Sequence, residues 1–100
     1  MSKYAKQRDN NQKGIIRYLE QLKIPVWVCS DVGGGMPDLR INVNGRLYDL
    51  EIKNPDTSYG KKGFSPSQLK YVAFAGKKNV LLWYSIEDAE KFLKKKGYLL

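Results

Sequence analysis

A two-residue turn constrains the fold of this chain more than any other feature. Asn44-Gly45 lies between two segments, residues 39–43 and 47–53, in which apolar and polar side chains alternate. Such alternation is typical of β-strands with one buried face, and Asn-Gly favours the tight turn of a hairpin. The sequence therefore predicts an antiparallel hairpin in which the numbers of paired residues sum to 89, unless a bulge shifts the pairing by one residue.

The predicted pairing places two acidic side chains, Asp38 and Glu51, opposite each other on one face of the hairpin. Directly opposed like charges repel, so a positive charge is expected nearby. Lys53 lies two residues after Glu51 and would project from the same face. A hard cation such as Mg²⁺ or Mn²⁺ between the carboxylates would compensate them further. The residues alone leave two interpretations open, a metal site or a solvated edge of a basic protein.

The elements around the hairpin predict a mixed α/β fold. Apolar spacing predicts a helix over about residues 9–23, which Pro25 ends. The other predicted elements are a short buried strand at 26–29, a helix at 65–76, a strand at 79–84 and a helix at 85–97. The expected order is α-β-β-β-α-β-α, with a central mixed sheet flanked by helices in a single domain over residues 1–100.

Composition narrows the chemistry and the partners. The chain has no histidine and a single cysteine, Cys29, which excludes His-based triads and cysteine zinc sites; we expect a buried, structural thiol. Its formal net charge of +8 favours a polyanionic partner, most simply nucleic acid. No apolar run approaches the length of a membrane span, which predicts no membrane association and a cytoplasmic protein.

Three short motifs occur in an order and at separations shared with a known nuclease family. They are Gly-Met-Pro-Asp-Leu at 35–39, Glu-Ile-Lys-Asn-Pro at 51–55 and Ser-Pro-Ser-Gln at 65–68. They resemble the G-x-P-D-L, E-x-K-x-P and S-P-x-Q elements of the VRR-NUC (virus-type replication-repair nuclease) family, within the PD-(D/E)xK nuclease superfamily. The resemblance covers nearly the whole chain and implies a restriction-endonuclease-like core.

The resemblance also implies a metal-dependent phosphodiesterase. Asp38, Glu51 and the backbone carbonyl of Ile52 would bind Mg²⁺ or Mn²⁺. Lys53 would assist an attacking metal-bound water, and Gln68 would lie beside the site from its helix. An exposed position at the start of that helix is the alternative for Gln68.

Small members of the family, largely viral, are homodimers that act as Holliday-junction resolvases. That implies a structure-specific DNA endonuclease with branched DNA as its partner, in the cytoplasm of a bacterial host if a phage encodes the chain. The alternatives are a non-catalytic basic DNA-binding module with a nuclease-like fold and a restriction-like nuclease that cuts duplex DNA at one sequence.

The first helix departs from the family pattern, which often has a glutamate there. If the helix reaches back far enough, Asp9 falls on the face shared by Ile16 and Leu19 and would support the metal shell. A solvated charge near the N-terminus is the alternative for Asp9.

Positive charge and glycine suggest where DNA would touch. A Gly-rich loop lets a phosphate approach the backbone closely, and lysines in a flexible loop can follow phosphates. The Lys94-Lys95-Lys96 run has a plainer explanation, because cations complement the dipole at a helix C-terminus. The candidate DNA contacts are Gly34, Gly35, Lys61, Lys62 and Ser65.

The helix predicted at 65–76 is apolar around much of its circumference. A helix in so small a domain rarely has core on every side. Self-association, with Tyr98, Leu99 and Leu100 as contributors, and deep packing within one chain are the two explanations.

Overall fold

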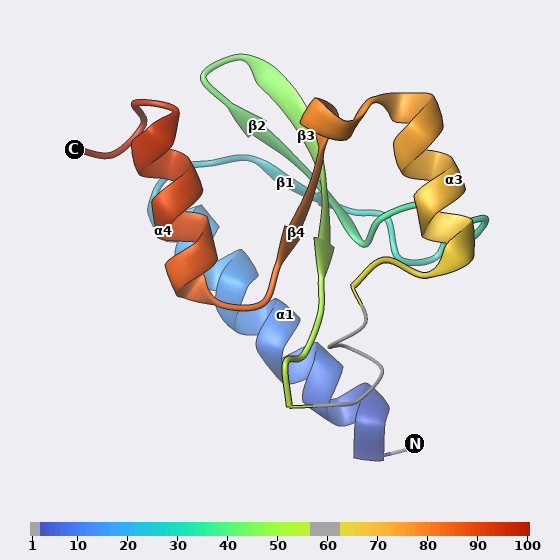
Figure 1. The fold of residues 1–100 in the computed structure, drawn as a ribbon. Helices are drawn as coiled ribbons and strands as arrows, with labels where there is room; N and C mark the ends of the chain where they lie inside the picture. Colours follow the sequence, from blue (N-terminus) through green and yellow to red (C-terminus); the bar gives the residue numbers. More distant parts are fainter. Residues whose placement is uncertain (1–2, 57–62) are drawn as a thin grey trace.

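The computed structural model describes residues 3–56 and 63–100, with side chains from Asn11 onward in the first helix. The element order agrees with the predicted order, and a short 3-10 turn is added before the last strand (Figure 1). The elements are α1 (Lys3–Gln21), β1 (Val26–Val28), β2 (Leu39–Val43), β3 (Arg46–Ile52), α3 (Pro66–Ala75), η1 (Lys77–Asn79), β4 (Val80–Trp83) and α4 (Ile86–Lys95).

The hairpin of β2 and β3 has the predicted register, from the turn outward to the pair Leu39 and Leu50. Asn44 has φ 55° and Gly45 has φ 86°, and these positive angles are the ones that a tight hairpin turn needs. The ladder between the described strands contains no bulge. Asp38 and Glu51 therefore lie one step beyond the last pair, as the sequence predicts.

The described strands form one mixed sheet in the order β1-β2-β3-β4, in which the β3–β4 pair is parallel and the other pairs are antiparallel. The prediction of a buried strand near residue 26 is wrong, because β1 is an edge strand with Trp27 and Val28 exposed. The prediction of a buried thiol is also wrong, since Cys29 is only partly buried at the end of this edge. Apolar composition alone does not distinguish an edge strand from a central one.

The hydrophobic core lies on the face of the sheet that α1 and α4 cover. Ile15 and Leu19 come from α1, and Leu93 comes from α4. The ring of Tyr48 on β3 meets Phe92 of α4 edge to face, with centroids 5.1 Å apart. Successive strand residues point to opposite faces, so the even-numbered residues of β3 face this core and the odd-numbered ones face away from it.

Helix α3 covers the other face of the sheet (Figure 1). None of its residues, all of which the structure describes, is buried, and Phe74 is 90% exposed. Deep packing within one chain therefore does not explain its apolar character. Tyr98 and Leu99 pack against the core instead of joining an exposed surface, whereas Leu100 is exposed.

Candidate active site

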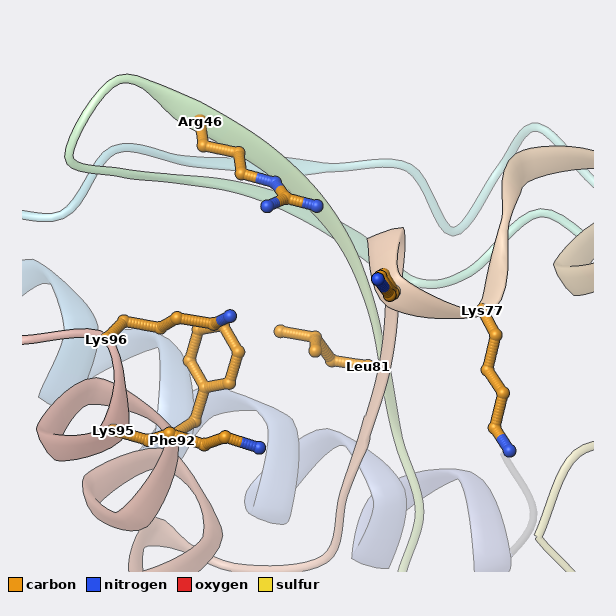
Figure 2. Close-up of a pocket in the computed structure, with 7 residues that line it drawn as sticks. Arg46, Lys77, Leu81, Phe92, Lys95 and Lys96 are labelled. Atoms are coloured by element: carbon orange, nitrogen blue, oxygen red, sulfur yellow. The ribbon is translucent and has the colours of Figure 1, made fainter.

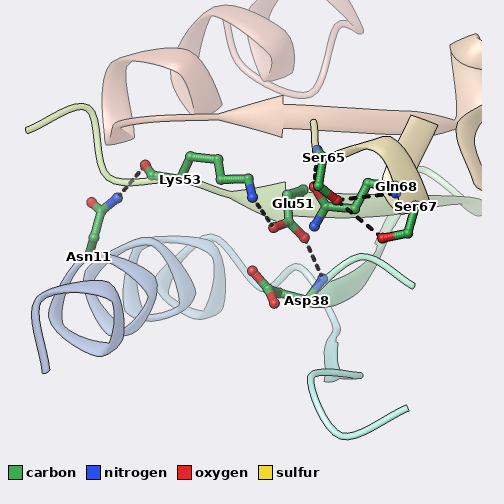
Figure 3. A network of polar contacts seen from close by, with 7 residues as sticks. All are labelled: Asn11, Asp38, Glu51, Lys53, Ser65, Ser67 and Gln68. Atoms are coloured by element: carbon green, nitrogen blue, oxygen red, sulfur yellow. Dashed lines mark hydrogen bonds and ion pairs between the residues drawn. The ribbon is translucent and has the colours of Figure 1, made fainter. Parts of the chain in front are cut away.

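The three residues at the centre of the prediction come together at the end of the hairpin. The backbone N–H of Asp38 donates a hydrogen bond to Glu51 Oε1 at 3.1 Å. The Lys53 Nζ lies 3.3 Å from the other oxygen of the same carboxylate, Glu51 Oε2. Figure 3 shows the two carboxylates and the amine gathered between α1 and the start of α3. Residues that are 13 positions apart in the sequence thus form one polar cluster.

Burial makes this cluster costly for the folded state. Glu51 is 0% exposed, Lys53 is 3% exposed and Asp38 is 8% exposed. Ionised groups removed from water lose hydration that only pairing and hydrogen bonding replace. The ion pair between Lys53 and Glu51 supplies part of that replacement, and among the described residues Asp38 brings a second carboxylate to the same cluster. Carboxylate oxygens gathered in this way are suited to binding a hard cation.

The sheet holds Glu51 rigidly. β3 lies between β2 and β4, and Glu51 is paired with Leu82 of the parallel neighbour. Its two neighbours along the strand, Leu50 and Ile52, are buried in the core on the opposite face. These contacts contradict the interpretation of the carboxylates as a solvated edge. The Ile52 carbonyl stays a predicted ligand that follows Glu51 directly on the same strand.

The Gly-rich loop before Asp38 packs against the start of α3. Gly35 has φ +84°, and a Cβ built on it would lie 2.4 Å from the backbone oxygen of Ser67. Only glycine allows this approach, because a Cβ would collide with the backbone. At Gly34, by contrast, nothing that the structure describes lies within 4 Å of a built Cβ. Gly35 therefore has a packing role, and contact of either glycine with DNA remains a prediction.

The contact at Gly35 brings the motif at the start of α3 next to the carboxylates. Ser65 caps the helix: its Oγ accepts a hydrogen bond from the Gln68 N–H, and its own N–H donates to Gln68 Oε1 at 2.9 Å. Pro66 occupies the first turn, where its missing N–H costs nothing. Figure 3 shows the Gln68 side chain on the side of α3 that faces Glu51. The capping bonds hold Gln68 in that position.

Helix α1 joins the site through a residue that sequence reasoning missed. The Asn11 Nδ2 donates to the backbone oxygens of Lys53 at 3.0 Å and of Tyr84 at 3.3 Å. Asn11 lies four residues before the buried Ile15, so helical spacing alone would have placed it on the inward face. It ties α1 to the backbone of the segments that follow β3 and β4, one of which carries Lys53.

A second polar cluster on the same face of β3 anchors α3 to the sheet. The Asp49 carboxylate accepts from Arg40 Nε at 2.8 Å and from the Tyr71 hydroxyl at 2.6 Å. Burial raises the pKa of the Tyr71 hydroxyl above its ordinary value, and the hydrogen bond to Asp49 raises it further. The hairpin register predicts the Arg40 contact, but the contribution of Tyr71 depends on the tertiary position of α3.

The acidic cluster matches a hard divalent cation in the chemistry of its donors. Carboxylate and carbonyl oxygens are the ligands that Mg²⁺ and Mn²⁺ prefer. Glu51 Oε2 is buried and, apart from its ion pair with Lys53, accepts no hydrogen bond from the part of the chain that is described. No group of three or more His, Cys, Asp or Glu side chains forms among the described residues. A cation held here would complete its shell with backbone and water oxygens.

Several predicted contacts are not tested by this geometry. α1 begins at Lys3 and so reaches back to Asp9, as the prediction required, but the Asp9 side chain is outside the described part. Lys61 and Lys62 lie outside the described residues altogether. Ser65 is described, and its Oγ accepts the capping bond from the Gln68 N–H and lies 3.3 Å from the Ser67 Oγ, with which it shares a hydrogen bond.

Comparison with protein-family models, with curated proteins and with solved structures found no match to this chain. Among the described helices, none has both the length and the apolar character needed to cross a membrane. The buried cluster and the positive charge of the chain are therefore the features that bear on its function.

Proposed function

We propose that this chain is a metal-dependent DNA endonuclease that hydrolyses phosphodiester bonds at Asp38, Glu51 and Lys53. The observation that carries the proposal is the fully buried Glu51 carboxylate, bonded by the Asp38 N–H and paired with Lys53. Replacing buried ion pairs by apolar residues is often neutral or stabilising. A cluster of this kind is therefore better explained by chemistry than by stability of the fold.

Each residue has a definite role in the proposed site. Asp38, Glu51 and the Ile52 carbonyl would hold Mg²⁺ or Mn²⁺. The bound ion would supply a more acidic water and positive charge beside the phosphate. The Asp38 N–H fixes the orientation of the Glu51 carboxylate. The Lys53 amine would orient the water or offset negative charge that develops on the phosphoryl oxygens. Gln68 would position the substrate from α3.

The finer proposal is a homodimeric Holliday-junction resolvase of the VRR-NUC type. Its support is α3, an apolar helix with no buried residue over the described chain and with Leu69 and Phe74 exposed. Pairing of two such helices would cover this surface and create two active sites related by a twofold axis. Two such sites suit symmetric cleavage of a four-way junction. We place this activity in the cytoplasm, which is that of a bacterial host if the gene belongs to a phage.

Cleavage assays on matched DNA substrates test the proposal. The substrates are a four-way junction, a flap, a single strand and a linear duplex, each with Mn²⁺ or with EDTA. We expect Mn²⁺-dependent cleavage with preference for the junction, and a loss of at least 100-fold, a size typical for a group that acts in the transition state, in Glu51→Gln and Lys53→Ala. Glu87→Gln, which changes an exposed acid on α4, is the control and should cleave normally. Equal cleavage by Lys53→Ala would reject the assigned role of the amine.

The second candidate is a non-catalytic DNA-binding module with the same fold. The observation in its favour is that the described residues place two acidic side chains, and not three, at the site. This candidate predicts junction binding without a metal-dependent product. The assay above separates the two, because only the enzyme yields shorter DNA strands.

A further inference from the structure

A basic pocket lies at the opposite end of β3 from Glu51. It has a volume of about 450 Å³. Leu81 and Phe92 form its apolar part, and Figure 2 shows the cationic side chains around them. Five cations line it: Arg46, Lys77, Lys78, Lys95 and Lys96. None of the described lining residues is acidic.

The helix dipole does not account for this pocket. A dipole explains lysines at the end of α4, but Arg46 begins β3, and Lys77 belongs to the three-residue turn η1. The lysine run itself is divided: Lys94 pairs with Glu90 at 3.2 Å on the surface, whereas Lys95 and Lys96 line the pocket. Three elements that are distant in sequence thus bring like charges to one concave surface.

Two of the cations are held in place before any ligand binds. The Arg46 guanidinium lies 5.0 Å from the centre of the Tyr48 ring and donates to Asn79 Oδ1 at 3.0 Å. The Lys96 Nζ lies 5.7 Å from the centre of the Phe92 ring. Clustered cations repel one another, and an anion in the pocket would remove that repulsion. Preorganised donors lower the entropy that binding costs.

We propose that this pocket binds the phosphate backbone of a nucleic-acid segment other than the one that is cleaved. Arg46 and Glu51 are five residues apart on one strand, which corresponds to about 17 Å, and their side chains point to opposite faces. One short stretch of backbone therefore does not serve both places. Five cations exceed what a single phosphate contacts, and a concave surface suits a strand better than a flat membrane.

This inference rests on the proposed function, because it assigns the pocket to a second arm of the DNA substrate. It predicts a contact that depends on charge and not on base sequence, since lysines that meet phosphates carry no sequence information. Binding should be strongest for DNA long enough, or branched enough, to reach the pocket and the carboxylates together.

Binding measurements with two triple variants test the inference. The pocket variant is Lys77→Gln, Lys95→Gln and Lys96→Gln. The control variant, Lys23→Gln, Lys70→Gln and Lys91→Gln, removes the same charge from exposed lysines that do not line the pocket. Fluorescence anisotropy with a labelled four-way junction in EDTA, at 50–200 mM salt, gives affinity and its salt dependence. Matched thermal unfolding curves confirm that both variants fold.

A plot of log K against log salt has a negative slope, and each duplex phosphate contact contributes about 0.9 to its magnitude. We expect the pocket variant to reduce that magnitude by about 2–3 units. The control variant should lower it by less than one unit. Equal losses in the two variants would overturn the inference, because they would show an effect of net charge alone. Inorganic triphosphate that displaces the DNA equally well from the wild type and from the pocket variant would also overturn the inference. So would pocket-dependent binding to phosphatidylserine vesicles and not to DNA.

The outcomes separate this inference from the proposed function. If the wild type shows metal-dependent cleavage and both variants bind the junction equally, the proposed nuclease activity stands and the proposed role of the pocket is rejected. Pocket-dependent binding without cleavage under any metal would reject the nuclease and keep the pocket as a backbone contact. A double variant, Lys95→Gln with Lys96→Gln, gives the same comparison if the triple variant unfolds.

Discussion

Replacing Gly35 by alanine tests how the loop before Asp38 is held against α3. The backbone at Gly35 has φ +84°, and left-handed backbone costs a residue with a Cβ about 1–2 kcal/mol. The added Cβ would also lie 2.4 Å from the Ser67 oxygen, whereas real Cβ atoms stay beyond about 3.0 Å, so one backbone must move by about 0.6 Å. Overpacking of this kind adds about 1–3 kcal/mol. We expect Gly35→Ala to lower the free energy of unfolding by about 2–5 kcal/mol.

Gly34→Ala is the matched control for this prediction. Gly34 has φ +65°, and no described atom lies within 4 Å of a built Cβ, so it shares the strain without the collision. We expect a loss of about 1–2 kcal/mol there. Urea unfolding followed by tryptophan fluorescence measures both values. Equal losses in the two variants would refute the close approach as the reason for glycine at position 35.

Three further predictions concern the polar clusters and α3. Tyr71→Phe removes the hydrogen bond to Asp49 and should lower the free energy of unfolding by about 1–2 kcal/mol. Because the folded-state pKa of Tyr71 is raised, that contribution is present below pH 10 and should be lost as the pH rises from there through the folded pKa, which urea unfolding across alkaline pH measures. Mn²⁺ at 100 times its dissociation constant should stabilise the wild type by about 2.7 kcal/mol in thermal unfolding and should leave Glu51→Gln almost unchanged; equal stabilisation of both would place the ion elsewhere. Phe74→Asp should shift the mass in sedimentation from twice 11.5 kDa toward 11.5 kDa, while Val32→Asp, another exposed apolar position, should not; a wild type that sediments as one chain would contradict self-association through α3.

The hairpin and its acidic cluster were predictable because their determinants are local. Asn44-Gly45 sets the turn, alternation sets the face of each side chain, and the register then follows by counting. The register is confirmed, and Asp38, Glu51 and Lys53 lie together as counting requires. The turn residues, the strand alternation and the placement of charge all favour the same hairpin. The hairpin can therefore be predicted without knowledge of how the rest of the chain packs.

Features that depend on tertiary packing were not predictable in the same way. The exposure of β1 follows from its place at the edge of the sheet, which its apolar residues do not reveal. The bond between Tyr71 and Asp49 needs the position of α3, and the basic pocket needs η1 and α4 to meet the start of β3. Asn11 was within reach of helical spacing, but polar residues on an inward face are easily taken for solvated ones.

The seven-residue strand β3 fixes the distance between the basic pocket and the acidic cluster. Arg46 stands at one end and Glu51 near the other. The extended backbone is paired with β2 from Arg46 to Leu50 and with β4 from Asp49 to Ile52, so every residue between the two ends is held by at least one neighbouring strand. Insertions in the surrounding loops would therefore leave the span between the two ends untouched. Only the addition or removal of residues within the strand itself would change that span. An odd number of added or removed residues would also turn the side chain at one end of the strand to the opposite face of the sheet.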